Sequence, residues 1–271
     1  MALKTILLHL DHQDCSPRTD IAVSLAKAHG ARLIGLFAEL SKAHTVGSVA
    51  TWPPESYKEA AATARAAFDA KTAGLDKVEW RDANRGGAGE IIQVVTEAAH
   101  NADLVILGKD QGPGATHSSV PAGMAEQVIL QSGRPALVVP NAGHFTSLGA
   151  RPVIAWNNKR EAARALKDAV PLMAGATEAL VVTFVDRADA TAESAEECVR
   201  YLADHGISAR IECLVVEGIG IMDMLLSRAG DTGADLLVMG AHSHYGFPFA
   251  IRGNGTRHVL SETFIPVLMS N

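Results

Sequence analysis

The stretch ADLVILG, from Ala102 to Gly108, returns almost unchanged as ADLLVMG, from Ala234 to Gly240. An internal repeat decides how many folded units a chain holds, so it takes priority over any shorter motif. One further pair, RPALVVP with IPVLMS, repeats at a similar offset, and two more, KTILLHLD with RPVIAWNN and ARLIGLF with EALVVTF, repeat at offsets nearer 147. The sequence therefore predicts two copies of one fold, residues 1–141 and 151–271, joined by a linker over residues 142–150.

Within each copy, short runs rich in Leu, Val and Ile alternate with Ala-rich segments of helical period. This alternation is typical of a parallel sheet that is covered by helices on both faces. We therefore expect two tandem Rossmann-like, doubly wound α/β domains, each a mostly five-stranded parallel sheet flanked by helices. Helices are expected over 54–72 and 89–102 in the first copy and over 160–175 in the second. Ser16 is expected to cap the first helix, with Pro17 at its first position.

Composition fits two ordinary globular domains. Among 271 residues, 30 acidic and 24 basic side chains leave a formal charge of −6, which gives no attraction to nucleic acid or anionic lipid. The apolar runs are far shorter than the ~20 residues of a membrane-spanning helix. The three cysteines, Cys15, Cys198 and Cys213, show no CxxC spacing, which argues against a disulfide framework or a zinc site. We expect a cytoplasmic protein that binds neither nucleic acid nor membrane.

The loop after LLVMG carries the most chemical information in the chain. In open parallel sheets, ligands bind beyond the carboxyl ends of the strands. This loop has small residues at positions 240, 243, 253 and 255, and it leads into a helix. Small residues let backbone N–H groups approach a phosphate, and a helix N-terminus favours its charge. The loop therefore suggests a phosphate cradle; alternatively, these are simply the turn residues of a strand-to-helix connection.

At this point the sequence resembles the universal stress protein family, in the tandem form that fuses two family domains. The family motif is a glycine, two residues, a glycine, nine residues, and then glycine followed by Ser or Thr. Gly240 and Gly253 match the first and third glycines, 13 positions apart (253 − 240). Ser243 replaces the second glycine, and Asn254 replaces the Ser or Thr.

The resemblance also implies where a nucleotide base and ribose lie. The family places an Asp at the end of the first strand, and alignment of the following helix puts Asn157 there, an amide without charge. Phe184 is implied to lie close to the adenine, where its ring either stacks on the base or obstructs it. The nucleotide site predicted for the second copy consists of Asn157, Phe184, Gly240, His242, Ser243, Gly253, Asn254 and Gly255.

The first copy departs from the family pattern in the complementary way. It keeps Asp11 after its first strand, but its loop after Gly108 has no Gly–Ser pair at the family spacing. Pro121, which has no N–H to donate, stands where the third glycine belongs. We expect no ATP in the first copy.

Neither a metal site nor a catalytic group is expected. His242 and His244 are spaced as metal ligands can be, but no Cys, Asp or Glu lies nearby to complete a tetrahedral set. Ser243 lacks the flanking glycines of a nucleophile elbow. The loop histidines are interpreted as exposed side chains.

The leading hypothesis is a tandem universal stress protein, a non-catalytic stress-response module whose second copy binds ATP or AMP weakly. The alternative is an interaction or scaffold protein that binds no nucleotide in either half. An enzyme of nucleotide hydrolysis ranks last, because it needs a positioned base and a metal-holding carboxylate that the sequence does not reveal.

The two copies are expected to pack on each other as an intramolecular pseudo-dimer through their closing strands, residues 136–140 and 266–270. Each of these strands is short, apolar and at the edge of its own sheet, and pairing would cover both edges. Two like domains in one chain can adopt the twofold arrangement that identical chains reach by dimerising. A further homodimer and the protein partners are left open.

Overall fold

The computed structural model describes residues 2–46, 49–109, 118–185, 193–216, 220–241 and 255–271. Contacts between Cα atoms divide the chain into two compact units. The N-terminal unit comprises residues 2–144 and the C-terminal unit residues 145–271. The pairing of the two closing strands, residues 136–140 and 266–270, stays a prediction.

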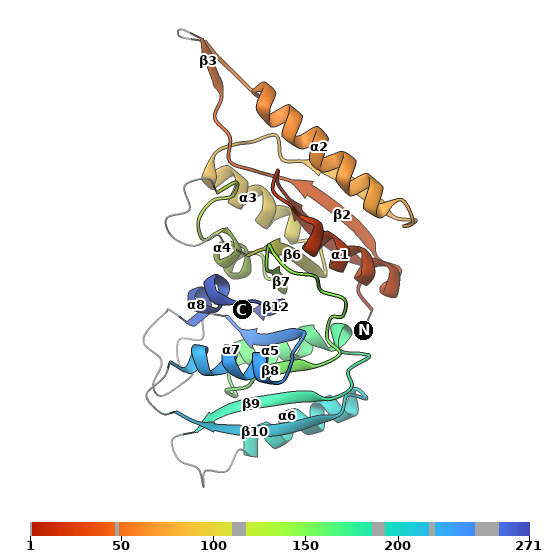
Figure 1. Cartoon of the computed structure of the whole chain (residues 1–271), viewed down its shortest axis with the longest axis vertical. Helices are drawn as coiled ribbons and strands as arrows, with labels where there is room; N and C mark the ends of the chain where they lie inside the picture. The colour runs from red at the N-terminus through yellow and green to blue at the C-terminus, as the bar shows by residue number, and fades with distance from the viewer. Residues whose placement is uncertain (1, 47–48, 110–117, 186–192, 217–219, 242–254) are drawn as a thin grey trace. The chain divides into compact units, whose positions relative to one another are not determined.

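The N-terminal unit is a parallel sheet with the strand order β5-β2-β1-β6-β7 (Figure 1). Helix α1 contacts α2, and α3 contacts α4. The chain builds outward from β1 to β2 and β5, then returns to the other side of β1 for β6 and β7, so the strand order reverses between β1 and β6. The strands are β1 (Thr5–Leu10), β2 (Arg32–Phe37), β5 (Val78–Asp82), β6 (Leu104–Gly108) and β7 (Ala136–Val139), and the helices are α1 (Ser16–His29), α2 (Glu55–Thr72), α3 (Ala88–Ala99) and α4 (Met124–Gln131).

The C-terminal unit repeats this plan with the order β10-β9-β8-β11-β12, again all parallel. The predicted fold class, doubly wound α/β with five-stranded parallel sheets, is therefore confirmed in both units. The strands are β8 (Pro152–Ala155), β9 (Ala179–Val185), β10 (Ala209–Val215), β11 (Leu236–Gly240) and β12 (Val267–Ser270). The helices are α5 (Arg160–Ala169), α6 (Glu193–Asp204), α7 (Ile221–Asp231) and α8 (Gly255–Glu262), with a 3-10 turn, η1 (Val170–Leu172), after α5.

The repeated Asp of the ADL motif anchors the first strand of each unit. Oδ2 of Asp103 accepts hydrogen bonds from the backbone N–H groups of Lys4 and Thr5, at 2.7 and 2.9 Å. Asp235 does the same for Ala150 and Arg151, at 3.0 and 2.9 Å. The carboxylate just before the fourth strand of each sheet thus fixes the start of the neighbouring first strand.

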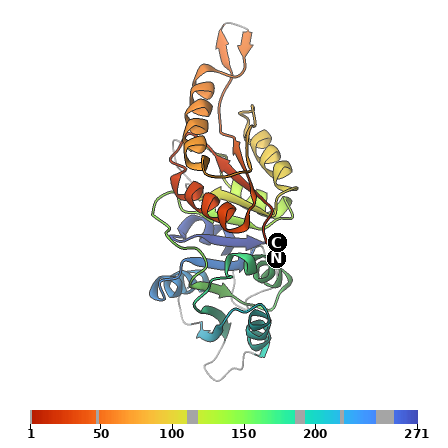
Figure 2. The same cartoon turned by 90° about the vertical axis from the view of Figure 1, so that its right-hand side faces the viewer.

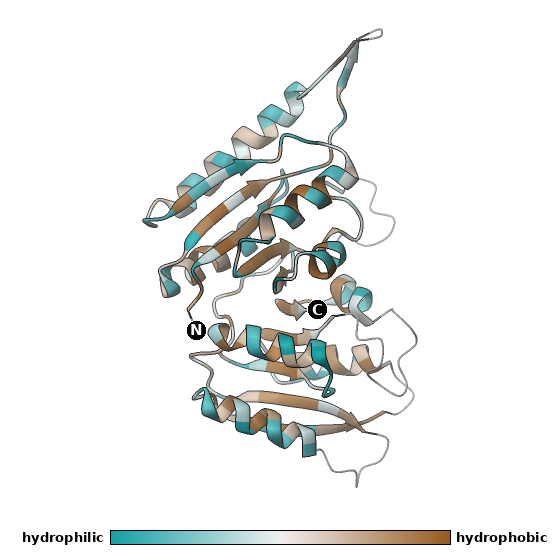
Figure 3. Cartoon of the chain, turned by 180° about the vertical axis from the view of Figure 1, so that it is seen from behind, coloured by the Kyte–Doolittle hydropathy of each residue, from teal (hydrophilic) through white to brown (hydrophobic). Residues whose placement is uncertain are grey.

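The central strands of each sheet are mostly apolar, as the brown strands in Figure 3 show. Strands covered by helices on both faces need continuous apolar runs, which is why the sequence revealed them. The edge strand β5, VEWRD, has exposed ends and half-buried residues between them, and the sequence analysis missed it. It lacks the Leu- and Val-rich signal because it is only partly covered.

The sequence analysis also missed a short antiparallel hairpin, β3 (His44–Val46) and β4 (Val49–Thr51), in the N-terminal unit. In Figure 2 it projects beyond the end of α2, away from the five-stranded sheet. Three-residue strands with polar side chains carry little of the periodic pattern on which the prediction depended.

Three predicted helix boundaries were wrong, and one of them is the end of the helix expected over 89–102, which stops at Ala99. Ser16 is the first residue of α1, and Cys15 occupies the cap position with no side-chain cap bond. The helix expected over 160–175 stops at Ala169 and gives way to the 3-10 turn η1. Pro171 explains the early end, because its ring clashes with the preceding turn and it donates no hydrogen bond.

The sheet register shows where the two copies differ in length. The first strands of the two units are offset by 146 residues (154 − 8), because Leu8 and Ile154 each pair with the same position of the repeated fourth strand. The second strands keep this offset. The third strands, through Trp80 and Ile211, are offset by 131 (211 − 80). The C-terminal copy has therefore lost 15 residues (146 − 131) between β9 and β10. The N-terminal unit carries its hairpin and its 18-residue helix α2 in the corresponding segment.

Gly149 offers a test of the backbone of the C-terminal unit. Its φ is +76°, and a Cβ there would lie 2.1 Å from the backbone oxygen of Leu172. Gly206 has a similar φ of +74° but open space around it. We predict that Gly206→Ala costs only the left-handed strain, about 1–2 kcal/mol, and Gly149→Ala clearly more.

The measurement is urea unfolding followed by ¹⁹F NMR of fluorotryptophan, because Trp156 reports on the C-terminal unit and Trp52 and Trp80 report on the N-terminal unit. Equal losses for the two variants would show that the chain avoids the contact with Leu172.

Candidate functional site

In each unit the strand order reverses between the first and fourth strands, at the carboxyl ends of β1 and β6 and of β8 and β11. Continuing the register past the strand ends makes Asn157 equivalent to Asp11 (157 − 11 = 146). The same offset makes Ala155 equivalent to His9 and Phe184 equivalent to Ala38. The sheet register thus makes Asn157 the counterpart of Asp11.

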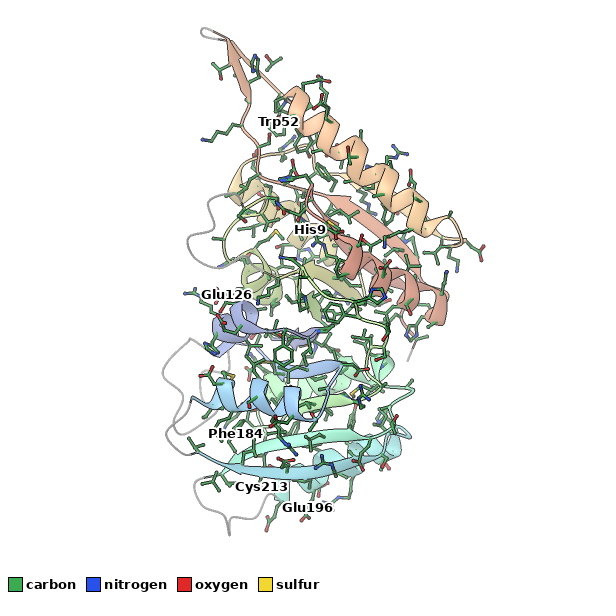
Figure 4. The ribbon with its side chains drawn as sticks, in the orientation of Figure 1. His9, Trp52, Glu126, Phe184, Glu196 and Cys213 are labelled. Carbon is green, nitrogen blue, oxygen red and sulfur yellow. The ribbon has the colours of Figure 1, made fainter. Side chains whose placement is uncertain are left out.

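In the N-terminal unit, this edge is built around a buried ion pair. Nη2 of Arg18 lies 2.9 Å from Oδ2 of Asp11, and the two residues are 3% and 5% exposed. Nε of Arg18 donates to the backbone oxygen of His9 at 2.9 Å. The ring of His9, labelled in Figure 4, is 2.7 Å through Nε2 from the backbone oxygen of Ala38. The first turn of α1 is thereby tied to the ends of both β1 and β2.

Burial and charge shift the titration of these groups. Burial alone would raise the pKa of Asp11, but the positive charge of Arg18, together with His9 and the Gln13 amide, outweighs it and holds the pKa below its ordinary value. Burial lowers the pKa of His9 to about 4, so this ring is neutral at physiological pH. Burial also raises the pKa of Cys15 to about 11, which leaves it as an unreactive thiol.

A cavity of about 110 Å³ opens beside this cluster. Gly108 forms part of its wall, and a Cβ there would lie 2.6 Å from Nη1 of Arg18. Asn141, just after β7, donates from Nδ2 to the backbone oxygen of Lys109 at 2.9 Å. Polar and charged side chains around the cavity include His9, Asp11, Arg18, Lys109, Ser119 and Asn141.

The sequence analysis identified Asp11 but missed His9, Arg18, Ser119 and Asn141. His9 was assigned only to a strand, and Arg18 only to the opening of a helix. All four residues follow or border the ends of strands. The sequence alone does not show that residues 9, 18, 119 and 141 come together. Pro121, on which the first-copy interpretation rests, is buried, and its oxygen accepts a hydrogen bond from Met124 N at 3.1 Å.

In the C-terminal unit, the helix after the first strand lies closer to the sheet. A Cβ on Gly240 would meet the backbone N of Ala162 and the backbone C of Glu161, both at 2.6 Å. The buried face of α5, with Ala162, Ala165, Leu166 and Ala169, matches that of α1 at an offset of 144, two fewer than the strands. The strand-to-helix connection is thus two residues shorter, and Ala162 replaces Arg18. Gly240 is required for this packing whatever else it does.

The other described residues of the predicted nucleotide site lie at or near this same end of the C-terminal unit. Oδ1 of Asn157 accepts a hydrogen bond from Lys159 N at 3.1 Å, which closes the turn into α5. Phe184 is half-buried near the end of β9, opposite Leu214 on β10 (Figure 4). Gly255 is the first residue of α8. The remaining predicted residues, His242, Ser243, Gly253 and Asn254, lie outside the described residues.

One further polar pair in this unit was not foreseen. Nε2 of His258, near the start of α8, lies 2.7 Å from Oδ1 of Asp223 in the first turn of α7. The pair links the beginnings of the two helices. In the part of the chain that the structure describes, no three His, Cys, Asp or Glu side chains group as metal ligands would.

Two doubly wound domains in one chain define it as a tandem α/β protein. Residues 153–271 match the model of the universal stress protein family, so the chain carries a domain of that family in its C-terminal unit. No curated protein gave a significant match.

Solved structures resemble the chain over both units. A universal stress protein from Archaeoglobus fulgidus has 17% identity and a TM-score of 0.71, with 98% of this chain and 96% of that chain covered. A putative universal stress protein from Pseudomonas aeruginosa has 18% identity and a TM-score of 0.59, with 99% and 93% covered. At these identities the likeness shows the fold, and it extends over the full length. Among the described helices, none is both long and apolar enough to cross a membrane.

The buried His9 predicts a specific pH dependence of stability. Its folded pKa, about 4, lies below the ordinary 6.5, so the unfolded chain binds more protons between these values. The corresponding stability is complete above pH 6.5 and falls as the pH drops to 4, by roughly 3 kcal/mol. His9→Ala, which installs the residue found at the equivalent position 155, should remove this part of the pH dependence.

The measurement is urea unfolding at pH 7.5 and pH 4, followed by the ¹⁹F signals of Trp52 and Trp80. Leu36→Ala, a buried truncation without a titrating group, is the control and should keep the pH dependence of the parent. An identical loss in His9→Ala and the parent would show that His9 is not neutral in the folded unit.

Proposed function

We propose that the chain is a tandem universal stress protein that acts as a ligand-binding module, and that its C-terminal unit binds ATP or AMP weakly. Two observations carry the proposal. By the register of the C-terminal sheet, Asn157, Gly240 at the end of β11 and Phe184 near the end of β9 lie at the same edge. Residues 153–271 also match the family model. The loop residues 242–254 between β11 and α8 would complete the site.

The C-terminal unit supports this assignment better than the N-terminal one. In the N-terminal unit, Asp11 is already engaged by Arg18, whose guanidinium lies against Gly108. In the C-terminal unit, the oxygen of the equivalent Asn157 accepts a hydrogen bond in a local turn, and the ring of Phe184 is half-buried near the end of β9. The helix α8, which begins at Gly255, offers its N-terminus to the phosphates.

The absence of a carboxylate at position 157 explains why the binding is proposed as weak. A hydrogen bond to an ionised acceptor is stronger than one between neutral groups, and Asn157 is neutral. The same observation supports the second candidate, an interaction or scaffold protein with no nucleotide in either half. A stress-response role, a cytoplasmic location and the lack of catalysis stay predictions.

Isothermal titration of the full chain with ATP and with AMP tests the proposal. We expect one binding event per chain, and Asn157→Asp should tighten it by about tenfold because it restores a charge-assisted contact to the ribose. Asn158→Asp is the matched control: it adds the same charge at the next position, whose φ of 55° an aspartate also tolerates.

The absence of binding heat from either nucleotide, for the parent and for Asn157→Asp alike, would favour the scaffold protein. Equal tightening by Asn157→Asp and Asn158→Asp would contradict the assigned role of position 157, since the effect would then come from charge alone.

A further inference from the structure

The cavity of the N-terminal unit contains hydrogen-bonding capacity that the described protein does not use. Among the described residues, Nδ1 of His9 and Oγ of Ser119 are buried without a partner. Both residues line the cavity, and they are only 1% and 3% exposed. A buried polar atom left unpaired costs about 1–3 kcal/mol, so two at one cavity point to something that binds there.

The hydrogen bonds already present decide what His9 can accept. Its Nε2 lies 2.7 Å from the Ala38 carbonyl oxygen, and a carbonyl oxygen only accepts, so Nε2 carries the proton. In a neutral ring, Nδ1 is then an acceptor. The lowered pKa of His9 agrees with the neutral state. The occupant must therefore bring an O–H or N–H donor to Nδ1, whereas the Ser119 hydroxyl can donate or accept.

The charges around the cavity do not favour an anion. Asp11 and Asp14 balance Arg18 and Lys109 among the lining residues. Arg18 directs Nε to the His9 oxygen and Nη2 to Asp11 and to Sγ of Cys15, so its Nε–Nη2 edge is already engaged. What remains is a set of single donors and acceptors side by side. Hydroxyl groups suit such a set, because each one both donates and accepts.

The cavity is small for a nucleotide. Its volume of about 110 Å³ lies below the roughly 300–1,000 Å³ of pockets that hold drug-sized ligands. Arg18 also occupies the space next to Gly108. The cavity is large enough for several waters or for one small molecule.

We propose that this cavity binds a small, neutral, polyhydroxylated molecule of the sugar or polyol class, with one hydroxyl donating to Nδ1 of His9 and another bonded to Ser119. The site is separate from the nucleotide site of the C-terminal unit. The C-terminal unit has no counterpart of its polar cluster, because Ala155 and Ala162 replace His9 and Arg18.

The test is NMR titration of the full chain, labelled with ¹⁵N, against glycerol, D-ribose and myo-inositol, with glycine and inorganic phosphate as probes of the zwitterionic and anionic classes. We expect at least one polyol to shift the backbone amides of His9, Ala38 and Ser119 and the ring Nδ1 signal of His9. No shift with any polyol would overturn the proposal and leave ordered water as the occupant. Shifts with glycine or phosphate alone would show that the ligand is not a neutral polyol.

Two variants connect the shifts to the cavity. Ser119→Ala and His9→Ala should each weaken the polyol affinity roughly five- to tenfold, the value of one hydrogen bond. Thr96→Ala is the matched control, because the Thr96 hydroxyl is equally buried and unpaired but does not line the cavity. Ser119→Ala removes one oxygen from a buried position and should fold, which its amide spectrum checks. Unchanged affinity in Ser119→Ala, or equal loss in Thr96→Ala, would contradict the site.

Discussion

The register between the first and fourth strands is the constraint on which both units depend. In each sheet, the aspartate of the ADL motif accepts two backbone N–H groups at the start of the first strand, Asp103 in the N-terminal unit and Asp235 in the C-terminal unit. A slip of one residue would turn every side chain of the strand to the opposite face. With the register held at the amino ends, the residues that meet at the carboxyl ends are also determined, and these ends form the edge at which we propose that ligands bind.

Besides the 15 residues missing between β9 and β10, the two copies differ in the space next to the glycine that ends the fourth strand. In the N-terminal unit, the guanidinium of Arg18 lies against Gly108 and neutralises Asp11. In the C-terminal unit, a connection two residues shorter brings the backbone of α5 against Gly240. The first arrangement leaves a small polar cavity, and the second leaves Asn157 at the edge of a loop with the family spacing. One scaffold thus supports two different proposed ligands.

Much of the fold could be predicted from the sequence, because the inner strands are buried on both faces and read as continuous apolar runs. The strands that the prediction missed lack this apolar pattern, because β5 and the hairpin β3–β4 are short and partly polar. The helix α5 was predicted too long, because Pro171 ends it earlier than its Ala-rich composition suggests.

The candidate site was predictable only in part. The sheet register, not the following helix, makes Asn157 the counterpart of Asp11: the buried faces of α1 and α5 match at an offset of 144, which would put Ala155 there (11 + 144). The contacts of Arg18 with His9 and Asp11 could not be foreseen, because they depend on how the first turn of α1 meets two strand ends. Ser119 and Asn141 enter the cavity from segments about a hundred residues further along the chain, a distance across which local patterns carry no information.

Hydrogen–deuterium exchange of the full chain with and without saturating ATP tests the central claim most directly, namely that the two copies share a frame but differ in their ligand. The account predicts slower exchange in the C-terminal unit, over residues 156–160 and 255–262, and unchanged exchange over residues 9–18 and 104–109 of the N-terminal unit. Slower exchange confined to the N-terminal segments would contradict it, because ATP would then occupy the copy in which Arg18 already holds Asp11.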